Sequence, residues 1–152
     1  MTLIARLDDD LKGAMRSGDS LRRNVIRYLK AQLHNQEIAD QSELDDDGVL
    51  RVLTKQAQQR KESIRAFEEG GRADLVDKES AELEIIMEYL PQQLSKEEIR
   101  EAVDQAVTEA GARGPGDMGA VMGRLMPRLR GRADGREVSA IVSETLRAID
   151  GA

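Results

Sequence analysis

The sequence predicts an all-α protein: an N-terminal domain of about four helices at residues 1–94 and a C-terminal three-helix bundle at residues 95–152. Apolar residues recur every three or four positions, and no stretch alternates apolar and polar residues as a strand would. Pro91 ends one helix, and Ser95 with Glu98 three residues later begins the next, which sets the domain boundary. Because aromatic residues make up only 2%, the core is expected to be aliphatic.

Each expected helix of the N-terminal domain carries one apolar face, and capping residues mark its ends. Asp19 or Ser20 caps the second helix, and the aspartates at 45–47 suit the start of the third, where the helix dipole favours negative charge. The expected helices span residues 3–17, 20–39, 46–69 and 72–90. Their apolar faces contain Leu3, Leu7, Leu11 and Met15, then Leu21, Val25, Leu29 and Leu33, then Val49, Leu53, Ile64 and Phe67, then Leu75, Leu83, Ile86 and Leu90.

The middle of the third helix is unusually polar. It reads KQAQQRKES, in which the only apolar residue is an alanine. We expect this stretch to be exposed or to face a polar partner, because unpaired polar groups are costly to bury. A protein partner of the N-terminal helices would then contact Lys55, Gln58, Gln59 and Lys61.

Three short helices are expected in the C-terminal bundle. The first follows the Ser95 capping box and ends near Gly111, the second begins at Pro115, and Gly131 ends it before the third. Their apolar faces contain Ile99, Val103, Ala106 and Val107, then Met118, Met122, Leu125 or Met126 and Leu129, then Val138, Ile141, Val142, Leu146 and Ile149.

The composition argues against several classes of function. The chain has no cysteine, its one histidine is His34 in the second helix, and no glycine loop precedes a Lys-Ser or Lys-Thr pair. We therefore expect no catalytic residue, metal or cofactor of its own. The acidic N-terminus does not resemble a signal peptide, and no apolar run is long enough for a membrane span, so a cytoplasmic location is expected.

Five arginines lie close together in a chain whose net charge is −6. The first two are four residues apart on one helix face, and the last two flank the turn into the final helix, where a glycine N–H is free to bind an anion. Arginine forks there favour a phosphate ligand or an interdomain contact, and the residues alone leave both open. The alternative is that they pair with acidic residues or coat the surface. The predicted site contains Arg124, Arg128, Arg130, Arg132, Arg136 and Gly135.

The stretches YLPQQLSKEEI and GPGDMGAVMGRLMPRLRGRADGREVSAIV resemble the YqeY proteins over essentially the whole chain. These form one family with the tail of the B subunit of the tRNA-dependent amidotransferase, which converts Glu-tRNA(Gln) or Asp-tRNA(Asn). The resemblance implies an all-helical fold and a tRNA partner, with the five arginines matching the family's basic motif. One departure is Gly114, where family members often carry a capping serine.

Three interpretations follow. The leading one is a non-catalytic tRNA-binding adaptor similar to that tail, with phosphate contacts that position the RNA without reading its sequence. The second is a protein–protein interaction module without RNA binding, which the acidic net charge and the few aromatic residues favour. The third follows from the resemblance alone: an accessory factor to glutamine-dependent amide transfer, a carbon–nitrogen ligase reaction, acting in trans.

Overall fold

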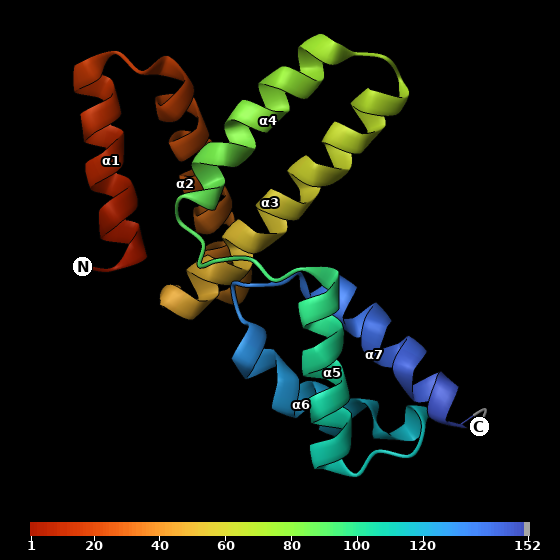
Figure 1. The fold of residues 1–152 in the computed structure, drawn as a ribbon. Coiled ribbons are helices and arrows are strands. Elements are labelled where there is room, and N and C mark those ends of the chain that lie inside the picture. The colour runs from red at the N-terminus through yellow and green to blue at the C-terminus, as the bar shows by residue number, and fades with distance from the viewer. Residues whose placement is uncertain (151–152) are drawn as a thin grey trace. The chain divides into compact units, whose positions relative to one another are not determined.

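The computed structural model describes residues 1–150, and these form seven α-helices and one short 3-10 helix, with no strand among them (Figure 1). The all-α prediction is confirmed. The chain packs as two compact units, residues 1–91 and the residues from 92 onward. That the two units are separate domains, with the boundary at residues 94 and 95, stays a prediction. Every helix within residues 1–150 is too short or too polar to cross a bilayer.

The first unit contains two helical hairpins, α1 with α2 and α3 with α4 (Figure 1). Short polar side chains begin three of these helices, since Thr2, Asp19 and Asp45 each accept a hydrogen bond from a backbone N–H three residues later. The helices are α1 (Leu3–Ser17), α2 (Ser20–Asp40), α3 (Asp46–Glu69) and α4 (Ala73–Met87). The fourth helix therefore ends before Leu90, three residues earlier than expected.

The core of this unit joins α1, α2, the first half of α3 and the end of α4. It contains Leu7, Val25, Ile26, Leu29, Leu33, Val49, Leu53, Ala57, Ile85, Ile86 and Tyr89. Five residues of the expected apolar faces lie outside it: Met15 (54% exposed), Leu21 (40% exposed) and the half-buried Ile64, Phe67 and Leu75. A spacing of four residues turns a side chain about 40° further around the helix at each step, so the ends of such a row leave the core face. Ala14 is buried in place of Met15.

The polar middle of α3 is more deeply buried than the sequence predicts. Gln56 is 6% exposed and Ala57 is 3% exposed, although Lys55 is exposed as expected. Arg60 forms ion pairs with two glutamates of α4, Glu79 (3.0 Å) and Glu82. The stretch was expected to be exposed or to face a polar partner; the burial of Gln56 and Ala57 contradicts the first alternative, and Arg60 faces carboxylates of the neighbouring helix.

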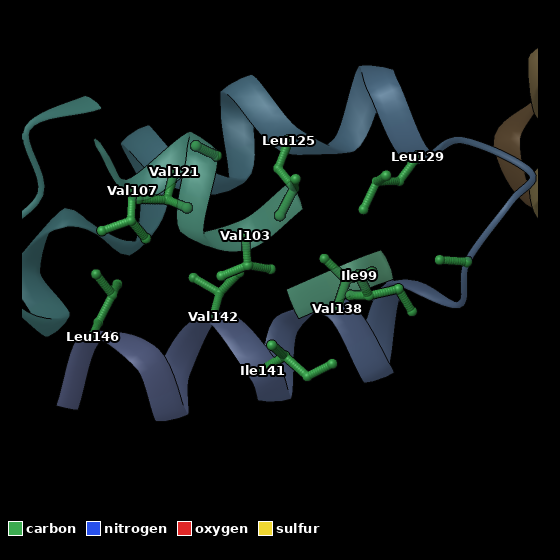
Figure 2. Close-up of a cluster of buried hydrophobic side chains, with 12 residues drawn as sticks. Ile99, Val103, Val107, Val121, Leu125, Leu129, Val138, Ile141, Val142 and Leu146 are labelled. Atoms are coloured by element: carbon green, nitrogen blue, oxygen red, sulfur yellow. The ribbon is translucent and has the colours of Figure 1, made fainter. Parts of the chain in front are cut away.

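The second unit is a three-helix bundle with an aliphatic core. Its elements are α5 (Lys96–Ala110), the 3-10 helix η1 (Pro115–Asp117), α6 (Met118–Leu129) and α7 (Gly135–Asp150). The predicted capping box of Ser95 and Glu98 begins α5. Figure 2 shows Val103 of α5, Leu125 of α6 and Val142 of α7 directed toward a common centre, and all three are 0% exposed. Ile149, in the last turn, is 37% exposed and outside this core.

Candidate nucleic-acid interface

The exposed face of α6 lies opposite its core residues. Val121, Leu125 and Leu129 point into the bundle, which leaves two neighbouring rows of residues on the outside. One row has only small or compact side chains, and the other carries two arginines. The rows are Gly119, Gly123 and Pro127, and Ala120, Arg124 and Arg128, and all six residues are exposed.

The glycines of this face are open to the outside. A Cβ placed on Gly119 or Gly123 would meet no atom within 4 Å, and neither residue has a left-handed backbone conformation. Both positions therefore have room for a side chain, although glycine in a helix interior costs about 1 kcal/mol relative to alanine. They leave a flat strip of helix backbone beside Arg124 and Arg128, and a ligand can approach that strip closely.

Arg128 reaches across to α5, where it contacts Glu109. Its Nη2 donates to Oε2 at 2.7 Å, and its Nη1 lies 3.5 Å from Oε1. The hydrogen bond from Arg128 lowers the pKa of Glu109, and the charge of Arg124 lowers it further. Arg124 and Arg128 therefore act on the same carboxylate, and both side chains remain exposed. Two of the predicted arginines thus form one basic patch, which we call the α6 patch.

Arg132 has a different environment, in the turn between α6 and α7. Its Nε donates to the carbonyl of Gln92 (3.2 Å), and its own carbonyl accepts from the N–H of Leu94 (2.9 Å). Beside it, Gln93 Nε2 donates to the carbonyl of Gly131 (2.7 Å), and Gly131 is buried with a φ of 77°. These hydrogen bonds hold residues 92–94 against the turn, so Arg132 helps to position the backbone of residues 92–94.

The remaining predicted residues lie around the same turn. Arg130 ends α6 and is half-buried. Arg136 is exposed, and its Nε lies 3.8 Å from Oδ2 of Asp134. Gly135 opens α7, and a Cβ at this position would lie 3.7 Å from Cε of Met126. The structure thus brings Arg124 and Arg128 together and places the others at the turn. That the six residues bind nucleic acid stays a prediction.

Sequence reasoning missed two contributors to this surface. The glycine row repeats every four residues, G-x-x-x-G-x-x-x-P over 119–127, and this spacing is a visible signal for one helix face. Glu109 has no such signal, because its pairing with Arg128 depends on how α5 packs against α6. Elsewhere, His34 is exposed, and residues 1–150 contain no group of three His, Cys, Asp or Glu side chains placed to hold a metal ion.

Comparison with curated proteins finds relatives among yeasts. Three are named "Altered inheritance of mitochondria protein 41, mitochondrial". The protein from Lachancea thermotolerans is 42% identical over 59% of this chain and 48% of its own length. Those from Eremothecium gossypii and Kluyveromyces lactis are 39% and 40% identical, each over 57% of this chain and over 48% and 47% of their own lengths.

The chain spans about half the length of the curated relatives it matches. Their names describe mitochondrial proteins, and this finding contradicts the cytoplasmic location expected from the sequence. A family model described as "Yqey-like protein" matches residues 4–146, which cover most of both units. The resemblance identified in the two sequence stretches is therefore confirmed, and the chain belongs to the YqeY family.

Proposed function

We propose that the protein is a non-catalytic tRNA-binding adaptor whose α6 patch contacts the phosphate backbone of the RNA. The observation that carries the proposal is the pairing of an arginine row with a row of open glycines on one exposed helix face. Phosphate contacts of this kind position an RNA by its shape and do not read its bases. This agrees with the low aromatic content, which offers few platforms for base stacking.

The geometry supports close contact with a backbone. Arg124 and Arg128 are one helical turn apart, so their guanidinium groups can reach neighbouring phosphates along a strand. Gly119 and Gly123 beside them present no side chain that would hold the RNA away. Arginine is suited to such sites because its planar fork donates two parallel hydrogen bonds to one phosphate.

A second candidate function is supported by the contact between Arg128 and Glu109. That contact shows the guanidinium of Arg128 already holding a carboxylate (2.7 Å), which is the group that an acidic protein surface would present. The protein-interaction module therefore uses the same patch with a different partner. The open glycines fit it as well, since a partner helix could lie along them.

Fluorescence anisotropy with labelled tRNA tests the proposal. The variant Arg124→Gln/Arg128→Gln is compared with the wild type over a series of salt concentrations. The matched control is Arg113→Gln/Arg147→Gln, which removes two exposed arginines of the same unit outside the patch. We expect the patch variant to bind at least about ten-fold more weakly, since hydrogen bonds to charged groups contribute about 1.5–3 kcal/mol each. The control variant changes the net charge by the same amount, and its tRNA affinity should fall far less.

Salt dependence provides the second readout. Each neutralised phosphate releases counterions, so binding should weaken with salt, and the patch variant should have a shallower slope than the control. If both double variants lose affinity equally, the loss comes from the change in net charge, and the α6 patch is not the site. If the wild type does not bind tRNA at low salt, the RNA proposal is refuted and the protein-interaction module is favoured.

A further inference from the structure

We propose that Glu109 is a built-in competitor for the RNA phosphate: in the free protein its carboxylate occupies the Arg128 fork, and bound RNA displaces it. The inference rests on the proposed function, and it adds an autoinhibitory contact to the same site. It concerns one side chain of α5 and one of α6, both in the second unit.

The contact has the form that a bound phosphate would take. Both carboxylate oxygens of Glu109 face the guanidinium of Arg128, at 2.7 Å and 3.5 Å, in the two-pronged arrangement that arginine also uses for phosphate. The charge of Arg124 acts on the same carboxylate. An anion that binds Arg128 in the same two-pronged way must therefore take the place of the Glu109 carboxylate.

The contact is also suited to being broken. Glu109 and Arg128 retain 32% and 47% of their side-chain exposure, so water can solvate both groups when they separate. Exposed ion pairs are weak, and their loss corresponds to about a two- to five-fold change in an equilibrium constant. Glu109 makes no other ion pair with the described residues. Glu109 is exposed and is not one of the core residues of the bundle.

The competitor sets a threshold for binding. A single anion that replaces Glu109 at Arg128 exchanges one ion pair for another and gains little. A nucleic-acid strand gains more, because it contacts several cations together and releases its own condensed counterions. Glu109 therefore lowers affinity for every ligand of Arg128 by about the same factor, and only a ligand with several anionic contacts binds firmly.

The test is a double-mutant cycle on the full chain with labelled tRNA at fixed salt. Glu109→Gln is compared with Glu101→Gln, which removes the same charge from an exposed residue of α5 that makes no ion pair with the described residues. Glu109→Gln should tighten tRNA binding about two- to five-fold, and Glu101→Gln should tighten it clearly less. In an Arg128→Gln background the advantage of Glu109→Gln over Glu101→Gln should disappear.

Two results would overturn the inference while the proposed function stands. One is equal gain from the two glutamate variants, and the other is an undiminished advantage of Glu109→Gln when Arg128 is already glutamine. If instead Arg128→Gln alone binds tRNA as tightly as the wild type, the proposed use of Arg128 fails, and the inference about Glu109 fails with it. Circular dichroism of each variant checks that the helices are intact.

Discussion

Gly123 gives a prediction in which stability and binding change in opposite directions. It lies in the interior of α6, is exposed, and has open space around the position of a Cβ. Replacing such a glycine with alanine should stabilise the second unit by about 0.8–1.0 kcal/mol, because the unfolded chain loses backbone freedom and the added Cβ meets no atom within 4 Å. For a small domain this corresponds to roughly 4–8 °C in Tm.

Binding should respond in the other direction. If RNA approaches the glycine row of the α6 patch, the added carbon at Gly123 holds the backbone away from Arg124 and Arg128. We therefore expect tRNA affinity to fall for Gly123→Ala and to fall further for Gly123→Leu, although leucine is also a good helix former. The assays are thermal unfolding of the full chain and anisotropy with labelled tRNA.

Two controls separate surface bulk from helix stabilisation. Gly13→Ala changes an exposed glycine in the interior of α1, also with open space around its Cβ, and should stabilise the first unit without changing binding. Ala140→Leu adds bulk to an exposed position of α7. The reasoning is refuted if Gly123→Leu is stable and binds tRNA as tightly as Ala140→Leu does.

Two further predictions concern the first unit, and urea unfolding measures both. Arg60→Met should lower its stability by up to about 3 kcal/mol, since Glu79 and Glu82 lose their cation, and adding Glu79→Gln and Glu82→Gln should restore most of the loss. The hydrogen bond from Arg22 holds the pKa of Glu88 below its ordinary value of 4.5. As the pH falls, this carboxylate is therefore protonated at a higher pH in the unfolded chain than in the folded protein. Unfolding free energy should therefore fall as pH drops below about 4.5, and less steeply in Glu88→Gln; an equally steep decline would contradict the assignment.

Local signals in the sequence predicted the helices well. Ser95 and Glu98 form the expected capping box, and Asp19 and Asp45 cap the helices that follow them. These signals are reliable because a cap and the donors it satisfies lie within three residues of each other. Periodicity was less accurate near helix ends, as the exposure of Met15 shows, because a row of residues four apart rotates around the helix.

The tertiary polar contacts could not be predicted in this way. Gln56 is buried within a polar stretch, and Arg60 is neutralised by glutamates about 20 residues later in the chain. The sequence showed that the arginines are clustered, but it did not show that they have different contacts. Arg132 donates to the carbonyl of Gln92 across the turn, whereas Arg128 faces Glu109 on another helix. These roles depend on which elements become neighbours, and residue spacing does not encode that.

The most direct test of the account is an NMR titration of the isotope-labelled full chain with tRNA, in which backbone amide shifts report the contact surface. The account predicts that the largest changes lie on the exposed face of α6, at Gly119, Gly123, Arg124 and Arg128, together with Glu109 as it leaves Arg128. Changes confined to α1–α4, or none at low salt, would contradict the claim that the α6 patch binds RNA.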